Sequence, residues 1–232
     1  MVSPVLELAM RLSYPVVVLL SYAWTAAAQP APNGYPVKPV PLPDSVEIAL
    51  AVSAAPAELS NQATVYAVRD GQVLTLRRGS NGSACLVARD LHGGSLYPIC
   101  YNAEGARTVL ARELLEVRLR SLGASEDSVE RAVAAGYASG QLETPTSLAM
   151  AYMMSPRQVL FSSPRPEGRR VGAWHPHLMF FVPGATPSMF GLSSEDAEPI
   201  AVSGSGTPRA EVVVKVQKWS DGTAVAGPTK AP

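Results

Sequence analysis

The chain has 232 residues, of which 47% are apolar and 16% are charged, and its 19 basic and 19 acidic side chains cancel. A net charge of zero argues against a nucleic-acid partner, because binding to a polyanion draws on a basic face. The apolar content is sufficient for a sizeable core in one domain.

Residues 14–28 form an uncharged, mostly apolar run that follows Arg11 and ends in three alanines. The run is shorter than a comfortable membrane span, which needs about 17–25 residues. The small residues at its end suit signal-peptide cleavage after Ala28. We therefore predict a signal peptide over residues 1–28 and a secreted or periplasmic mature protein without a stable membrane span. A retained anchor is the alternative.

Residues 29–43 are rich in proline, which is typical of a stiff, extended linker. We place one ordered domain at residues 44–219 and a disordered tail at residues 220–232. Strand-like segments come first, a helical hairpin follows, and strand-like segments return. This order predicts an α+β fold, with a mostly antiparallel sheet and the helical hairpin packed on it.

Alternation and turn residues define the expected strands. A β-hairpin is expected to turn at Asp70-Gly71, and Asn81-Gly82 marks a second turn. The first expected strand is also expected to be buried. The strands are predicted at residues 45–56, 63–70, 73–79, 83–90, 147–154, 157–163, 177–183 and 211–219.

Residues 106–122 change to a helical period, and a second helix is expected to follow the N-cap residue Ser125. Opposite charges stand four residues apart at Arg112, Glu116 and Arg120. Such pairs support a solvent-exposed helix face, so we predict that this charged face of the first helix is exposed.

The two cysteines, Cys85 and Cys100, are an even count in a chain that is expected to reach an oxidising compartment. We predict a disulfide between them. In the chain-entropy model, a crosslinked loop of this size stabilises the fold by roughly 3 kcal/mol. A redox pair or metal ligands are the alternatives, but the chain has no C-x-x-C motif.

Three histidines are candidates for a metal site. His175 and His177 stand two residues apart and would share one face of a strand, and His92 could supply a third ligand for zinc or copper. Pro176 between the first two disturbs regular strand geometry. The alternative is structural, with His177 beginning a buried strand and donating to a backbone carbonyl. We expect no cofactor, and zinc or copper is the alternative.

Arg165, Arg169 and Arg170 crowd one loop and are candidates for binding a carboxylate or phosphate group. Glu167 stands among them, and exposed basic loops are usually just solvated. The motifs G-x-S-x-G, H-E-x-x-H, S-x-x-K and G-x-G-x-x-G do not occur, which removes the commonest enzyme families without excluding catalysis.

Several short motifs recur in order, at residues 80–86 (SNGSACL), 98–100 (PIC), 149–154 (AMAYMM) and 176–179 (PHLM). Together they resemble a group of small secreted bacterial proteins of unknown function. In that group a proline stands at the position of His175, so the resemblance singles out His177 alone. It implies a secreted protein and no particular activity.

Two function classes remain open. The first is an uncharacterised exported bacterial protein that acts as a non-catalytic, disulfide-stapled binding or envelope-associated domain, with an unknown partner. The second is a secreted metal-binding protein or enzyme centred on His177, with His92 and His175.

Overall fold

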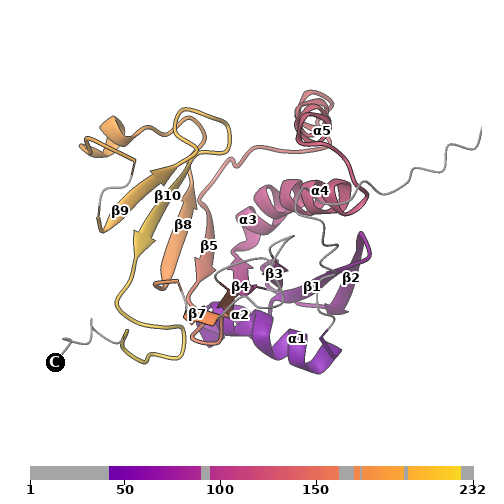
Figure 1. The fold of residues 1–232 in the computed structure, drawn as a ribbon, viewed down its shortest axis with the longest axis vertical. Coiled ribbons are helices and arrows are strands. Elements are labelled where there is room, and N and C mark those ends of the chain that lie inside the picture. The colour runs from indigo at the N-terminus through magenta and orange to yellow at the C-terminus, as the bar shows by residue number, and fades with distance from the viewer. Residues whose placement is uncertain (1–41, 90–94, 162–169, 173, 196–197, 226–232) are drawn as a thin grey trace, which may run out of the picture.

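The computed structural model describes residues 42–89, 95–161, 170–172, 174–195 and 198–225. The fold is α+β, as the sequence predicts, with one large sheet and helices on both of its faces (Figure 1). Its helices are α1 (Asp44–Ala51), η1 (Val52–Ala54), α2 (Ala57–Ser60), α3 (Ala103–Arg107), α4 (Val109–Ser121), α5 (Glu126–Ala138) and η2 (Pro187–Phe190). Its strands are β1 (Thr64–Arg69), β2 (Gln72–Arg77), β3 (Ala84–Arg89), β4 (Leu96–Tyr101), β5 (Ala149–Met153), β6 (Leu160–Phe161), β7 (Arg170–Gly172), β8 (His177–Phe181), β9 (Ile200–Ser203) and β10 (Glu211–Lys215).

The large sheet has eight strands in the order β2-β1-β3-β4-β5-β8-β10-β9. Neighbouring strands are antiparallel except β1 and β3, which run parallel. Strands β6 and β7 form a separate two-stranded sheet. Helices α3, α4 and α5 follow β4 and precede β5 in the sequence. These two strands are neighbours in the middle of the large sheet.

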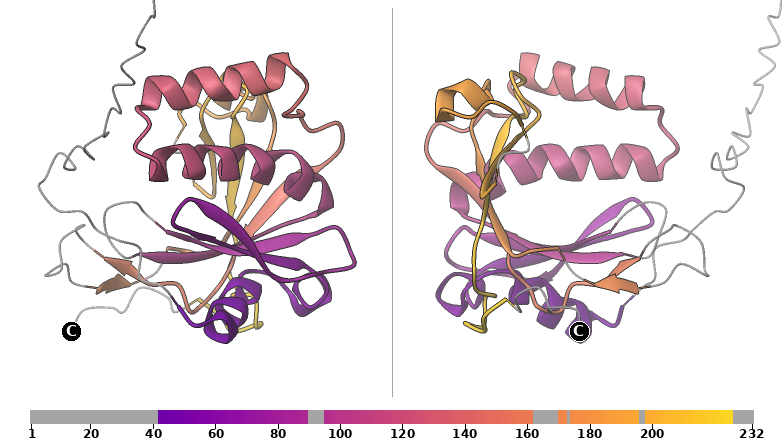
Figure 2. Two further views of the ribbon diagram at one scale, coloured as in Figure 1. Left: turned by 90° about the vertical axis from the view of Figure 1, so that its right-hand side faces the viewer. Right: turned by 60° about the vertical axis from the view of Figure 1, so that its left-hand side comes forward.

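Helices α4 and α5 stack on one side of the sheet, and α1 and α2 lie on the other side (Figure 2). The main core lies under α4, where Leu110 packs with Tyr101, Met179 and Phe181. A second core cluster joins α1 to the opposite face, around Val65 and the two cysteines. The sheet is therefore buried on both faces near its centre.

The expected buried strand at residues 45–56 is wrong, because this segment forms α1 and η1. The buried side chains are Glu47, Leu50, Ala51 and Ala54, which is the spacing of one helix face rather than of a strand. Alanine also favours the helix, and acidic residues in the first turn suit the positive end of the helix dipole. Because most positions of residues 45–56 are apolar, the sequence pattern does not distinguish a helix from a buried strand.

The predicted hairpin is confirmed as β1 and β2, and Asp70 and Gly71 both have positive φ, of 48° and 73°. Two successive left-handed residues give the twist that a tight hairpin needs. The turn at Asn81-Gly82 is also confirmed, since Gly82 has φ 75° and Oδ1 of Asn81 accepts a hydrogen bond from the Ser83 amide.

The two predicted helices are confirmed as α4 and α5, but the exposure of the charged face is wrong. Arg112 and Glu116 are each only 8% exposed, whereas the apolar Leu122 is 68% exposed. Charge pairs four residues apart form equally well on a buried face when the neighbouring strands supply further partners. Here the charged stripe of α4 turns inward, toward β10.

Strands β4 and β9 were missed, because Pro98 lies inside the first and turn residues surround the second. In the expected tail, residues 220–225 bond back to the body, since the Ser220 amide donates to Met154 O at 2.9 Å. The signal peptide, the linker up to residue 41 and residues 226–232 lie outside the described residues. None of the helices in the described ranges is long and apolar enough to cross a membrane.

Candidate functional site

The disulfide between Cys85 and Cys100 is formed, as predicted. The two residues are direct partners on the antiparallel strands β3 and β4, with their Cα atoms 4.0 Å apart. Both are fully buried beneath α1. The crosslink therefore belongs to the core, and its burial fits a structural role better than a redox role.

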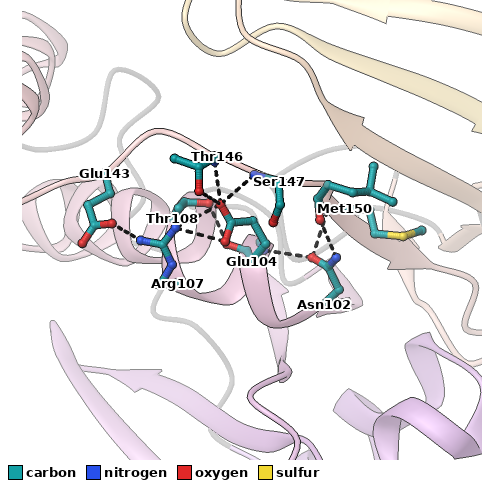
Figure 3. Close-up of polar contacts among 10 residues, drawn as sticks. Asn102, Glu104, Arg107, Thr108, Glu143, Thr146, Ser147 and Met150 are labelled. Atoms are coloured by element: carbon teal, nitrogen blue, oxygen red, sulfur yellow. Dashed lines mark hydrogen bonds and ion pairs between the residues drawn. The ribbon is translucent and has the colours of Figure 1, made fainter.

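The segment that leads into α4 is fixed by a set of hydrogen bonds at the start of α3 (Figure 3). Oδ1 of Asn102 caps the helix by accepting from the Gly105 amide at 2.9 Å, and it also accepts from the Met150 amide at 3.1 Å. Its Nδ2 donates to Leu148 O at 2.7 Å. These bonds join the N-terminus of α3 to the entry of β5 and so set where α4 crosses the sheet.

Glu104 forms the second half of this anchor (Figure 3). Its Oε1 accepts from the Thr146 amide at 2.7 Å, and Arg107 forms an ion pair with it at 3.0 Å. The backbone hydrogen bond from Thr146, followed by the one from Arg107, lowers the pKa of the Glu104 carboxyl to about 2. Thr108 Oγ1 donates to Glu104 O, where α3 bends into α4.

The charged face of α4 forms a half-buried ionic cluster, which is the main polar feature between α4 and the sheet. Glu116 lies at its centre and is approached by three guanidinium groups. They belong to Arg112 at 3.4 Å, Arg120 at 3.3 Å and Arg209 at 3.2 Å. Arg120 also pairs with Glu126 of α5 at 2.9 Å. The cluster thus links α4 to α5 and to the segment before β10.

Three further groups extend the cluster into the sheet. The buried Tyr101 hydroxyl donates to Oε2 of Glu113, and Arg112 lies 3.2 Å from Oε1 of the same carboxyl. Burial raises the pKa of Tyr101 well above its usual range and also raises the pKa of Glu113. Burial, followed by the charge of Glu113, raises the pKa of Glu211 on β10 to about 7.

A shallow hollow adjoins this cluster, between α4, α5 and the loop before β10. Arg112 and Arg209 give it positive charge, and Tyr137, Phe181 and Pro208 give it apolar walls. Both arginines are already paired with carboxylates. A ligand anion would therefore have to compete with Glu116.

The predicted histidine site is described only in part. His177 begins β8, and its Nδ1 lies 2.8 Å from His175 O, which accepts only if Nδ1 carries the proton. Burial lowers the pKa of His177, so its ring favours the neutral form. His92 lies outside the described residues. No three His, Cys, Asp or Glu side chains in the described part of the chain come together to hold a metal.

The surroundings of His177 are aromatic. Its ring centroid lies 6.4 Å from that of Trp174, which lies 5.2 Å from that of Tyr97. The buried Gln158 holds the backbone of Trp174 by donating to its carbonyl at 2.8 Å and accepting from its amide at 3.2 Å. These contacts agree with the structural role that the sequence offered as the alternative for His177.

The predicted anion site lies almost wholly outside the described residues. Arg165 and Arg169 belong to residues 162–169, and only the backbone of Arg170, at the start of β7, is described. The anion site therefore stays a prediction from the sequence.

The ionic cluster itself was missed by sequence reasoning. The charge pairs within residues 106–122 pointed to it, but such pairs usually lie on an exposed face, and the sequence therefore predicted that this face contacts solvent. The partners Arg209 and Glu211 come from a segment about ninety residues later in the chain, which no local pattern connects to α4.

Comparison of the chain with protein-family models, with curated proteins and with solved structures finds no match.

Proposed function

We propose that this protein is an exported, disulfide-stapled domain that binds a partner or serves the cell envelope without catalysis. The observation that carries the proposal is the crosslink between Cys85 and Cys100. Both sulfur atoms lie in the core, between α1 and the sheet, and the described part of the chain has no free cysteine. Structural disulfides of this kind persist in oxidising compartments and are rare in the cytosol.

The chemistry of the ionic cluster supports a non-catalytic role. The Tyr101 hydroxyl donates its hydrogen bond to Glu113. Because its pKa is raised, the hydroxyl stays protonated near neutral pH and cannot act as a base there. Glu116 is held by three arginines. These groups pair with one another between α4, β4 and the segment before β10, as expected for groups that fix a fold.

Export and oxidation are tested together by fractionating bacterial cells that express the full chain and by alkylating its thiols before and after reduction. We expect a shortened chain outside the cytosol, with both cysteines protected until reductant is added. The matched control lacks residues 1–28 and is expected to remain in the cytosol. An intact precursor in the cytosol with two alkylated thiols would refute the proposal.

A metal-binding role for His177 is the second candidate, and one observation favours it. A histidine that ligates a metal usually donates its other ring N–H to a carbonyl or carboxylate. Nδ1 of His177 does this toward His175 O, which leaves the lone pair on Nε2. His175 and His92 remain the proposed further ligands, with zinc or copper as the ion.

The metal candidate is tested by titrating the purified oxidised protein with Zn²⁺ or Cu²⁺ and measuring the bound metal per chain. Stoichiometric binding that is lost in His177→Ala, and weakened in His92→Ala, would support it. Equal weak binding by the unaltered chain and both variants would exclude this site.

A further inference from the structure

The charged side chains that line the shallow hollow beside the ionic cluster are all basic. Within the described residues they are Arg112 of α4 and Arg209 of the segment before β10, and no carboxylate lines the hollow. The other walls are uncharged and mostly apolar, and they include Tyr137 of α5, Phe181 of β8 and three prolines. Sites for small molecules commonly combine apolar walls with a few convergent polar groups. The hollow therefore has the composition of a site for a small, partly apolar anion.

Arg112 has hydrogen-bonding capacity that the cluster leaves unused. Its side chain is only 9% exposed, and a guanidinium group carries five N–H donors. Among the described residues only its Nη2 donates a hydrogen bond, to Glu113 at 3.2 Å. Its Nε lies 3.4 Å from Oε1 of Glu116, but neither of these two atoms has a hydrogen bond. Because a buried donor without an acceptor is costly, Arg112 is suited to take a further acceptor from the hollow.

Arg209 can turn to a ligand without leaving a carboxylate unpaired. Its side chain is 34% exposed, and its Nη2 lies 3.2 Å from Oε1 of Glu116. Glu116 also has Arg112 at 3.4 Å and Arg120 at 3.3 Å, so it keeps two counter-charges if Arg209 moves. An ion pair with solvent access is screened and contributes little to stability. Exchange of Glu116 for the carboxylate of a ligand therefore costs Arg209 little.

The N-terminus of α4 adds positive potential at the same hollow. Thr108 and Val109, where α4 begins, line the hollow together with the two arginines. This helix has 13 residues, but it has no side-chain cap at its N-terminus and no acidic residue in its first turn. The N-terminus of a helix attracts anions through its dipole and its first amide groups. The helix end and the buried Arg112 therefore favour an anion at one place.

We propose that this hollow binds a small monocarboxylate with a compact apolar body, such as an aromatic acid. The carboxylate lies against Arg112 and Arg209, because a guanidinium group matches the planar shape of a carboxylate. The apolar body lies against Tyr137 and the prolines. A phosphate group fits less well, since these apolar walls offer no hydrogen bonds to its remaining oxygens. The inference rests on the proposed binding role and deepens it by naming a class of ligand.

The test titrates the purified, oxidised protein, labelled with nitrogen-15, with sodium benzoate at constant ionic strength and follows the amide signals by NMR. Benzamide is the matched ligand, because it has the same ring and nearly the same shape but no charge. We expect the largest shifts at Arg112, Tyr137 and Arg209. Benzoate is expected to bind at least roughly 10-fold more tightly than benzamide, because its charge strengthens the hydrogen bonds from the two arginines.

Arg209→Gln is the test variant, because its partly exposed side chain can be shortened without opening the core. We expect it to weaken benzoate binding roughly 10-fold and to leave benzamide binding unchanged. Arg131→Gln is the matched control, since it removes the same charge from an exposed position on α5 and should keep full affinity. Equal affinity for benzoate and benzamide, or unchanged benzoate affinity in R209Q, would overturn the site. Either result leaves the export and alkylation test untouched, so the two proposals fail separately.

Discussion

At the scale of single residues, Gly79 occupies a position that only glycine fits. A Cβ placed there would lie 2.3 Å from backbone atoms of Gln62, Ala63 and Thr64. Backbone cannot move aside as a side chain can, so Gly79→Ala must displace the start of β1. We expect it to lower the free energy of unfolding by about 3 kcal/mol or more, measured by urea denaturation.

Gly136→Ala is the matched control for this prediction. A Cβ at Gly136 would meet only side-chain atoms of Leu142, at 2.8 Å, and that side chain can turn away. Alanine also stabilises a helix interior by about 1 kcal/mol over glycine, so the two effects partly cancel. Equal losses of stability in the two variants would show that the contact at Gly79 is not decisive.

At the scale of elements, the strongest expectations came from segments with one clear local signal. Asp70-Gly71 specified the hairpin, and the helical period of residues 106–122 specified α4, which ends just before Gly123, a residue with φ 81°. The first helix was misread because a run of small apolar residues satisfies a strand as well as a helix. The buried Glu47 of this helix pairs with Arg69 of β1 and Arg89 of β3, which no local pattern predicts.

The docking of α1 depends on that same residue. Glu47 is fully buried, and its two oxygens meet Arg69 of β1 at 3.1 Å and Arg89 of β3 at 2.8 Å. Removing one partner of a buried ion pair leaves the other charges uncompensated, which costs about 3–5 kcal/mol. We therefore expect Glu47→Ala to reduce the free energy of unfolding by that amount in urea denaturation.

The nearby Asp44 gives a matched comparison, because it pairs with the same Arg69 at 2.7 Å but its side chain is 62% exposed. An exposed pair contributes about 0–1 kcal/mol, so Asp44→Ala is expected to have little effect. If both variants lost the same stability, burial of Glu47 would not be what anchors α1.

At the scale of the whole molecule, the sequence supplied the composition, the fold class and the crosslink but not the interior charges. Arg69 and Asp44 form an ion pair although they lie 25 residues apart in the sequence. Glu211 is influenced by the charge of Glu113 on α4, which lies far earlier in the chain. Long-range pairing of this kind is set by the sheet order, which β-strand periodicity does not specify.

The carboxyl groups whose pKa changes on folding divide into two sets that act in opposite directions as the pH changes. The pKa of Glu104 is lowered to about 2, so its contribution to stability is complete above its usual value of 4.5 and is lost as the pH falls through about 2. Glu126, Glu198 and Asp221 also have lowered pKa values and act in the same direction. Glu211 acts in the opposite direction, above 4.5.

We therefore expect the free energy of unfolding to be greatest on the acidic side of neutrality and to fall toward both pH 2 and pH 8. His177, whose pKa is lowered, adds stability as the pH rises toward 6.5 and so broadens the maximum without removing it. Urea unfolding of the oxidised chain across this range measures the curve. Glu104→Gln should flatten its acid side alone, because the amide cannot titrate while Glu211 is unchanged. A stability that rises steadily to pH 8 would contradict this balance, because it would mean that folding does not raise the pKa of Glu211.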